Sequence, residues 1–187
     1  PMVRDCGTCD ACIPACPTGA IVAPGVLDAR RCLAAVLQSK GAIPRDLRAA
    51  VGDRWYGCDD CLTACPPGTR LAGSTTIERG RVDLTGMIAV ADRPLRDRHP
   101  HFYVPRNDGR WLRRNAIVAL ANAPRGDSDL VLAGLLGSPD SMIRTHAAWG
   151  LGRIGGPRAR AALAARRATE DDAEVVEEID LALGTLG

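Results

Sequence analysis

The sequence predicts an α-rich α+β protein with a cysteine-rich domain over residues 1–70, a connector over 71–90 and an α-helical repeat domain over 91–187. Three observations predict this organisation. All eight cysteines lie within the first 65 residues, the stretch after them is rich in Gly, Thr and Arg, and the second half repeats an Ala- and Leu-rich pattern. A chain of 187 residues is long enough to bury a core as one domain or as two small ones.

The cysteines form two runs, with the single residue Cys32 between them. The first run is Cys6-x2-Cys9-x2-Cys12-x3-Cys16-Pro17, and the second is Cys58-x2-Cys61-x3-Cys65-Pro66. The first spacing is typical of bacterial ferredoxins, in which three closely spaced thiolates hold one [4Fe–4S] cluster and the fourth thiolate holds another. The N-terminal domain is therefore predicted to be ferredoxin-like and to bind two [4Fe–4S] clusters.

Superposing the two runs assigns the ligands. When the second run is laid over the last three cysteines of the first, the spacings and the trailing Pro coincide, and Trp55 stands where Cys6 would be. The second run is thus one ligand short, and Cys32 is the cysteine left to complete it. The pattern predicts that cluster one is held by Cys6, Cys9, Cys12 and Cys65, and cluster two by Cys16, Cys32, Cys58 and Cys61. Because Cys12 and Cys16 are close in sequence, the two clusters are expected to be neighbours.

Disulfides and zinc are the alternatives for the eight cysteines. Four disulfides are typical of small secreted chains that lack a core, but the cysteine-free half of this chain is rich in Ala and Leu. A structural zinc site takes four ligands, commonly from CxxC pairs. The first run instead has three cysteines at two-residue gaps, followed closely by a fourth cysteine and a Pro, which is more than one CxxC pair supplies. This spacing therefore favours iron–sulfur clusters.

Short elements are expected around the cysteines. A helix is predicted over residues 29–40, with Cys32 in its first turn and Gly41 at its end. A second helix is predicted over 44–50, since Pro is favoured in a first helical turn. Residues 21–23 are expected to form a short strand or a turn.

The second half is predicted to consist of repeated helix pairs. Residues 114–124, 145–155 and 177–187 place small and apolar residues in register at offsets of 31 and 32, and second helices are expected over 129–136 and 157–168. A helix pair that recurs near this interval is typical of HEAT-like repeats, which bury their faces by stacking. The predicted fold class is thus a two-cluster ferredoxin-like domain followed by an α-helical HEAT-like repeat domain, in which His146 and Trp149 are expected to be packing residues.

A basic segment lies between the two predicted domains and extends into the second. Between Arg70 and Arg125 there are 11 Arg and 5 acidic residues, whereas residues 170–187 carry seven acids and no base. Aromatic residues interleave with the arginines, a combination that suits phosphates and unstacked bases. The alternative is a solvated surface with the aromatic residues as core. The predicted nucleic-acid contacts are Arg93, Arg96, Arg98, Arg106, Arg113 and Arg114.

In the order of its motifs the sequence resembles the epoxyqueuosine reductase family, whose members act in the last step of queuosine formation in tRNA. The resemblance covers nearly the whole chain. The matching stretches are 6–20, 27–32, 40–44, 56–66, 111–120 and 146–149. The family's cluster assignment is the crossed one derived above. The resemblance implies that the chain passes electrons to cobalamin and that its HEAT-like end binds the anticodon region of tRNA.

The resemblance also implies a missing part. The family's N-terminal domain, which carries much of the cobalamin site and the acid proposed to protonate the substrate, has no match here, so we expect a fragment that is inactive alone. Asp59 would lie near the corrin; the alternative is a turn residue whose carboxylate accepts backbone N–H groups. One segment departs from the family, since residues 33–38 are largely apolar where a polar and aromatic stretch leads into a Glu. A paralogue with another substrate therefore stays open.

Composition limits the remaining classes. The net charge is +2, and there is neither an apolar run long enough for a membrane span nor a secretion signal. We expect a cytoplasmic monomer that receives electrons from an external donor. The alternative function is a ferredoxin-type electron-transfer module with a protein-binding HEAT tail from another cobalamin or redox enzyme, such as a reductive dehalogenase.

Overall fold

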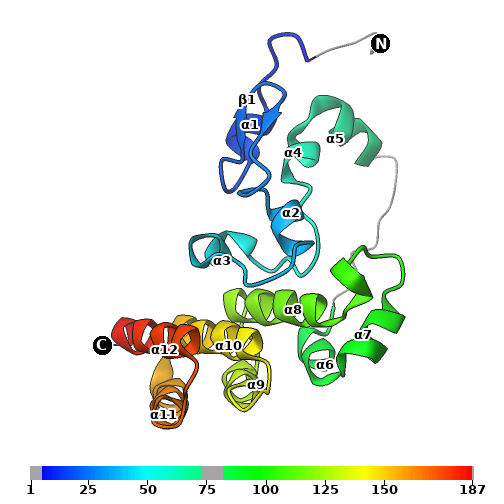
Figure 1. Cartoon of the computed structure of the whole chain (residues 1–187). Helices are drawn as coiled ribbons and strands as arrows, with labels where there is room; N and C mark the ends of the chain where they lie inside the picture. Colours follow the sequence, from blue (N-terminus) through cyan, green and yellow to red (C-terminus); the bar gives the residue numbers. More distant parts are fainter. Residues whose placement is uncertain (1–5, 73–81, 187) are drawn as a thin grey trace. The chain divides into compact units, whose positions relative to one another are not determined.

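The computed structural model describes residues 6–72 and 82–186, and it is mostly helical (Figure 1). The chain divides into two compact units. Of the described residues, 6–36 and 57–72 belong to the first unit, and 37–56 and 82–186 belong to the second. The segment between Cys32 and Cys58 is therefore mostly a part of the second unit, although both of these cysteines belong to the first. The predicted domain boundaries at residues 70 and 90 stay a prediction.

The first unit contains all eight cysteines on short elements. These are α1 (Cys12–Ala15), β1 (Ile21–Ala23), β2 (Val26–Leu27), α4 (Asp60–Ala64) and α5 (Pro66–Ala72). The predicted strand at 21–23 is confirmed, and it pairs antiparallel with β2, which was not predicted. The turn between them is Pro24-Gly25, and Gly25 has a φ of 73°, a conformation that a turn with Pro then Gly supplies without steric cost.

The helix that follows Cys32 is shorter than predicted. It is α2 (Leu33–Leu37), so Cys32 precedes the helix, and its carbonyl accepts the N–H of Val36 at 2.9 Å. The prediction that the helix begins at residue 29 is wrong because Asp28 holds the chain in a turn. Its carboxylate accepts the backbone N–H of Arg30 at 3.1 Å, and its carbonyl accepts the N–H of Arg31 at 3.1 Å.

The second unit begins with α3 (Arg45–Val51), which confirms the helix predicted over 44–50, with Pro44 as its N-cap. Helices α6 (Leu84–Ala89) and α7 (Asp92–Arg98) follow. Neither was predicted, and α6 lies in the predicted connector. Residues 73–81 of that connector lie outside the described residues.

Helices α8 to α12 form the predicted repeats. They are α8 (Arg110–Asn122), α9 (Ser128–Leu135), α10 (Ser141–Ile154), α11 (Gly156–Arg167) and α12 (Ala173–Thr185), preceded by the short helix η1 (Pro105–Asn107). Figure 1 shows α8, α10 and α12 in one row, with α9 and α11 in a second layer. The two second helices predicted over 129–136 and 157–168 correspond to α9 and α11, within a residue at each end. Both layers are therefore built from the helix pairs read from the sequence.

Glycines let the repeat helices approach closely. A Cβ atom added at Gly152 of α10 would lie 2.7 Å from the Cβ of Ala182 in α12. One added at Gly150 would lie 2.8 Å from a methyl carbon of Leu132 in α9. Both distances are shorter than van der Waals contact allows, so the absence of a side chain at these positions sets the spacing of the helices.

Three polar side chains in the row of α8, α10 and α12 bind the segment 37–52. Asn115 donates to the carbonyl of Leu37 at 2.8 Å, and His146 accepts the backbone N–H of Ile43 at 3.0 Å. Glu178 pairs with Arg48 at 2.8 Å and Arg45 at 3.0 Å. Because Asn115, His146 and Glu178 are equivalent positions of the repeat, one face of the repeats holds this segment along its length.

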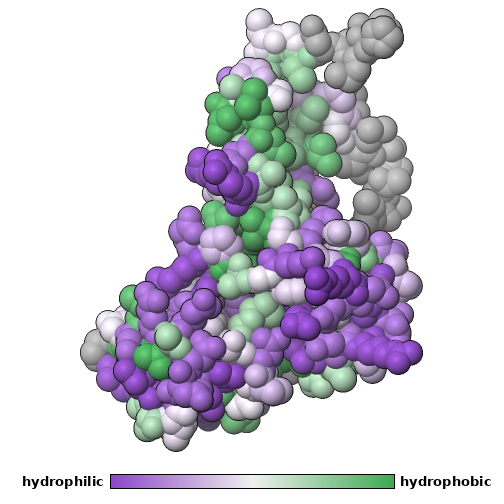
Figure 2. Space-filling view, viewed as in Figure 1, coloured by the Kyte–Doolittle hydropathy of each residue, from purple (hydrophilic) through white to green (hydrophobic). Residues whose placement is uncertain are grey.

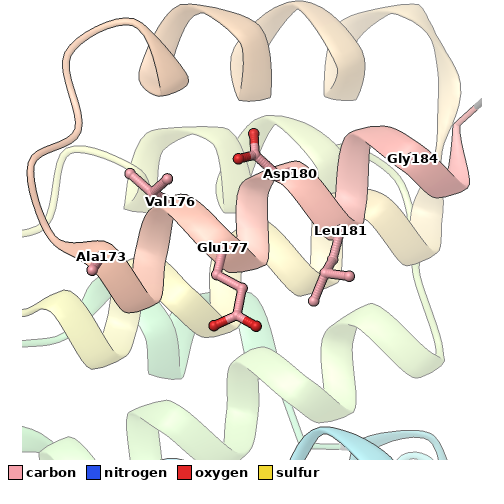
Figure 3. A pocket seen from close by; sticks show the side chains of 6 residues that line it. All are labelled: Ala173, Val176, Glu177, Asp180, Leu181 and Gly184. Carbon is pink, nitrogen blue, oxygen red and sulfur yellow. The ribbon is translucent and has the colours of Figure 1, made fainter.

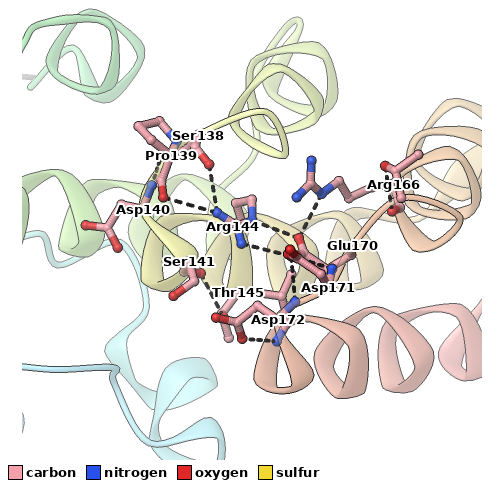
Figure 4. A network of polar contacts seen from close by, with 12 residues as sticks. Ser138, Pro139, Asp140, Ser141, Arg144, Thr145, Arg166, Glu170, Asp171 and Asp172 are labelled. Atoms are coloured by element: carbon pink, nitrogen blue, oxygen red, sulfur yellow. Dashed lines mark hydrogen bonds and ion pairs between the residues drawn. The ribbon is translucent and has the colours of Figure 1, made fainter.

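A second polar network joins the loops on either side of α10 and α11 (Figure 4). Arg144 pairs with Glu170 through two nitrogens, at 2.7 and 2.8 Å, and also donates to the carbonyl of Ser138 at 2.9 Å. Arg166 reaches the same carboxylate at 2.8 Å. Hydrogen bonds from Arg144, then from Arg166, hold the pKa of Glu170 well below its usual range. The network therefore fixes successive repeats to each other.

Candidate metal centre and nucleic-acid surface

The eight cysteines occupy turns and helix ends of the first unit, and all eight thiols are free. The disulfide framework considered from the sequence is therefore not formed. Six thiols are half-buried, while Cys6 and Cys9 are exposed. In the described part of the chain, no three His, Cys, Asp or Glu side chains converge as around a single metal ion.

Helices α1 and α4 are two copies of one local structure. Each begins beside an aspartate whose carbonyl accepts an N–H, from Ile13 to Asp10 at 2.8 Å and from Leu62 to Asp59 at 2.9 Å. Each ends at a cysteine in an extended conformation, with φ and ψ of −74° and 114° at Cys16 and −72° and 126° at Cys65. The two helices also pack against each other. The superposition of the two cysteine runs made from the sequence thus has a counterpart in the backbone.

The thiols of Cys58 and Cys32 each lie within electrostatic reach of the thiol of Cys61. The pKa of Cys61 is raised by its burial, then by the charge of Cys58, with a further contribution from Cys32. These residues are three of the four ligands predicted for cluster two, brought together from two segments of the chain. Thiolates this close repel each other, and binding to iron, which takes thiolates as ligands, would relieve that repulsion.

Cys16, the fourth predicted ligand of cluster two, accepts several hydrogen bonds. Its sulfur accepts the N–H of Ala20 at 3.2 Å and lies 3.7 Å from the Thr18 hydroxyl. Burial raises the pKa of Cys16, but hydrogen bonds from Thr18, Ile21 and Ala20 outweigh it and lower the pKa. A sulfur that is bonded by N–H groups and more easily ionised suits a cluster ligand, because such bonds stabilise thiolate and tune cluster potential.

Asp59 is exposed and lies directly before α4. Its side chain makes no capping hydrogen bond to the helix, whereas its carbonyl accepts the N–H groups of Leu62 and Thr63. The alternative in which the carboxylate caps the turn is therefore not what the structure contains. The residue is exposed to solvent and stands between Cys58 and Cys61 in the sequence.

The six predicted arginines fall into three groups: exposed, half-buried and fully buried. Arg93, Arg98 and Arg106 are exposed on α7 and η1, where Figure 2 shows strongly hydrophilic residues around α6 and α7. Arg114 is fully buried, and its guanidinium donates to the carbonyls of Leu37, Ser39 and Gly41. Burial lowers the pKa of Arg114 to about 10. The prediction that Arg114 contacts nucleic acid is wrong, because the side chain is enclosed by its own chain.

Arg96 and Arg113 are half-buried and have structural partners. Arg96 donates to the carbonyl of His99 at 2.6 Å and to that of Pro100 at 3.2 Å. Arg113 donates to the carbonyl of Val90 and pairs with Asp92 at 3.1 Å. Both side chains are already engaged in holding loops, so the surface available to a polyanion is narrower than the sequence predicted.

A shallow hollow of about 660 Å³ lies on α12 (Figure 3). It is lined by Ala173, Val176, Glu177, Asp180, Leu181 and Gly184. Asp180 already pairs with Arg167 at 2.6 Å. The lining offers neither a thiolate nor an arginine, so the hollow belongs to neither of the two predicted sites.

Sequence reasoning missed the polar row of Asn115, His146 and Glu178. A signal was present, since the offsets of 31 and 32 place these residues at one position of the aligned repeats. A polar position recurs together with the small and apolar residues that define the repeat. The expectation that His146 and Trp149 are packing residues agrees with their burial, at 0% and 8% exposure.

Comparison with known families assigns both halves of the chain. Residues 5–68 match the 4Fe-4S double cluster binding domain, and residues 106–184 match HEAT repeats. No helix in the described ranges is long and apolar enough to cross a membrane.

Several relatives are similar over the full chain. The epoxyqueuosine reductase of Bacillus anthracis is 33% identical over 193 residues, which cover all of this chain and 51% of that protein. The structure of epoxyqueuosine reductase from Bacillus subtilis matches with a TM-score of 0.87 at 32% identity, over 100% of this chain and 52% of that one. A crystal structure of epoxyqueuosine reductase with an epoxyqueuosine-modified tRNA-Tyr stem loop matches equally, at 33% identity over the same shares. The chain spans about half the length of these three relatives.

Proposed function

Because the chain belongs to the epoxyqueuosine reductase family, we propose that it is the electron-relay and tRNA-binding part of a cobalamin-dependent enzyme. The reaction would convert epoxyqueuosine to queuosine at the wobble position of tRNA. Loss of the epoxide oxygen as water takes two electrons and two protons, so the enzyme needs a path for electrons. The observation that carries the proposal is the paired structure of α1 and α4, which repeats one cysteine-bearing turn twice in one unit.

The cysteines of the first unit would hold the two [4Fe–4S] clusters in the crossed arrangement. Cluster one takes Cys6, Cys9, Cys12 and Cys65, and cluster two takes Cys16, Cys32, Cys58 and Cys61. The electrostatic reach of Cys58 and of Cys32 to Cys61 supports the second set. When bound, the clusters supply one-electron carriers that an external donor can reduce. The N–H groups on the sulfur of Cys16 would stabilise the added charge.

Asp59 would lie on the side of the first unit that faces cobalamin. Asp59 is exposed and its carboxylate makes no capping hydrogen bond to the helix, so the carboxylate is available to a ligand. When bound, cobalamin supplies the reduced cobalt centre that removes the epoxide oxygen. Most of its site would come from a part of the enzyme that this chain does not include, so we expect the 187 residues alone to show no turnover.

The tRNA would bind the second unit through its exposed arginines. Arg93, Arg98 and Arg106 have no ion-pair partner among the described residues. Each guanidinium that engages a phosphate releases condensed counterions, so affinity would fall by about 0.7 to 0.9 log units per tenfold rise in salt for each contact. The stem-loop complex of the similar enzyme supports an anticodon-region partner.

Anaerobic reconstitution of the chain tests the first half of this function. We expect about eight irons and eight sulfides per chain, four for each proposed cluster. A plateau near half of that content, or stoichiometric zinc in protein purified without oxygen, would contradict two clusters. Titration of an anticodon stem loop against the reconstituted chain at several salt concentrations tests the second half, and absence of salt-dependent binding would contradict it.

A further inference from the structure

Most of the aromatic residues of the chain gather at one place in the second unit. The chain has six Phe, Trp and Tyr residues, and Trp55, Tyr56, Phe102 and Tyr103 are neighbours there. The two others, Trp111 and Trp149, are buried at 9% and 8% exposure. The four gathered residues are half-buried or exposed, so unlike Trp111 and Trp149 they do not belong to the buried core.

Phe102 lies at the centre of this aromatic cluster. Its ring stacks on Tyr56 at a centroid distance of 4.0 Å and meets Trp55 edge-on at 5.1 Å. The ring of His101 lies 4.1 Å away and that of His99 5.8 Å away. The rings support one another in a stack and edge-to-face arrangement, which aromatic pairs prefer.

The loop 99–107 that carries the cluster is held at its carbonyl groups. Arg96 binds the carbonyls of His99 and Pro100, and the hydroxyl of Tyr56 donates to the carbonyl of Tyr103 at 2.9 Å. The indole of Trp111 donates to the carbonyl of Pro105 at 3.0 Å. The loop is therefore fixed by side chains from three other segments of the second unit.

This fixed loop presents one large ring to solvent, and exposed arginines precede and follow that ring in the sequence. Tyr103 is 67% exposed although its backbone is anchored. Arg106 follows in η1 and has a φ of 55°, in the left-handed region that arginine rarely adopts. Arg98 ends α7 directly before the loop and is also exposed. An exposed aromatic ring on a held backbone, with exposed arginines on either side of it in the sequence, fits a base and its phosphates.

We propose that the loop 99–107 is a stacking platform for one unpaired base of a bound RNA. Tyr103 is the ring on which the base stacks, and Arg98 and Arg106 contact the adjoining phosphates. The inference rests on the proposed function, which supplies the RNA partner. Beyond the arginine–phosphate contacts of that proposal, the platform would recognise one unpaired base. The side chains that hold the loop bind its carbonyl groups, including that of Tyr103, and these contacts do not account for its exposed ring.

Three variants of the reconstituted chain test the platform against an anticodon stem loop. Tyr103→Ala should weaken binding about tenfold while leaving the salt dependence unchanged, because stacking involves no counterions. Tyr103→Phe should bind like the original chain. Leu130→Ala, which shortens another exposed apolar side chain of the same unit, should have no effect.

Abasic substitutions in the RNA loop make the test specific. At the loop position whose base stacks on Tyr103, removal of the base should weaken binding to the original chain. The same removal should cause no further loss of affinity in Tyr103→Ala, which already lacks the ring. An equal loss by Tyr103→Ala for a fully paired duplex, or a loss that persists with every abasic loop, would overturn the platform. If the stem loop binds but Tyr103→Ala binds equally well, the platform alone fails; if the original chain does not bind it, the proposed tRNA function fails with it.

Discussion

The Nε2 atom of His146 in α10 accepts the backbone N–H of Ile43 at 3.0 Å. The other ring nitrogen lies 2.7 Å from the carbonyl of Met142, so the hydrogen-bond network requires a neutral ring protonated on Nδ1. Burial, and then the charge of Arg48, lowers the pKa of His146 to about 3. A residue distant in sequence thus holds the segment between Cys32 and Cys58 only while its ring is uncharged.

We expect the second unit to lose stability in mild acid because of His146. In the unfolded chain the ring takes up a proton near its ordinary pKa of about 6.5, while in the folded chain it stays neutral down to about 3. Between these values the unfolded state binds more protons, so the free energy of unfolding falls by about 1.4 kcal/mol per pH unit as the pH decreases. Denaturant unfolding from pH 7 to pH 5 measures this slope.

His146→Gln provides the control, because its amide can offer an acceptor and a donor but does not titrate. This variant should be less stable at pH 7 and should show a flatter dependence between pH 6.5 and 5. Equal slopes for the two proteins would assign the acid sensitivity to other groups.

Arg48 and Glu178 form a buried ion pair whose two members are nearly inaccessible, at 4% and 6% side-chain exposure. Replacement of Glu178 by Ala should lower the free energy of unfolding by about 3 to 5 kcal/mol, because Arg48 would be left buried without a counter-charge. Asp180→Ala, on the same helix, removes an exposed pair with Arg167 and should cost at most about 1 kcal/mol. Chemical denaturation of both variants measures the difference, and similar losses would contradict the role of burial.

The sequence predicted the elements whose signals are local or periodic. The cysteine spacing predicted the cluster-binding unit, and the recurrence of small residues predicted α8 to α12. Helix α7 was not predicted, because Pro94 and several charged residues leave no helical pattern of apolar residues in its sequence. Its one buried residue is Leu95. The turn at Asp28 was not predicted either, since it depends on one carboxylate that binds a backbone N–H group in place of a helical hydrogen bond.

The site residues show why charge counts alone were insufficient. Arg113 and Arg114 follow each other in sequence with the same side chain, yet one pairs with Asp92 at the edge and the other is enclosed among carbonyls. Which of the two adjacent arginines is fully enclosed depends on the carbonyl groups of the segment 37–41, which lies more than seventy residues earlier in the chain. Such long-range packing has no signature in local composition.

Arg114→Ala should therefore affect folding rather than charge-driven binding. The substitution removes the donors to three carbonyl groups and to the amide oxygen of Asn115, and it empties the space of a fully buried side chain. A loss of about 3 kcal/mol or more in stability is expected from the lost hydrogen bonds and the cavity. At temperatures where the variant is still folded, the salt dependence of stem-loop binding should match that of the original chain, whereas Arg106→Ala should flatten it by about one phosphate contact. A flatter salt dependence of binding in Arg114→Ala would show that this residue does contact the RNA.

Gly152 and Gly184 offer a matched test of helix packing. Gly152→Ala should destabilise the second unit by about 1 to 3 kcal/mol, because its Cβ would press on Ala182. At Gly184 no atom lies within 4 Å of an added Cβ. Gly184→Ala should be neutral or stabilise by up to about 1 kcal/mol, since Ala is the better helix former. Thermal unfolding distinguishes the two, and equal effects would show that α10 and α12 can move apart.

The crossed ligand assignment predicts which cluster each cysteine supports. Cys65 lies at the end of α4, four residues after Cys61, yet it is assigned to the cluster of Cys6. The packing of α1 against α4 makes such an exchange of ligands between the two runs possible. Cys65→Ser should thus damage the same cluster as Cys6→Ser, whereas Cys58→Ser and Cys32→Ser should damage the other.

Electron paramagnetic resonance of the four variants, reconstituted and reduced without oxygen, separates the two clusters by their signals. The loss of one thiolate should convert the affected cluster to a three-iron species or reduce its occupancy, while the other cluster keeps its spectrum, because each cluster retains its own remaining ligands. The two pairs should therefore give two distinct spectra. If Cys65→Ser and Cys58→Ser lose the same signal, each run holds its own cluster and the ligands do not cross. In that arrangement Cys16 would stay with Cys6, Cys9 and Cys12, and Cys32 would complete the second run without any exchange between α1 and α4.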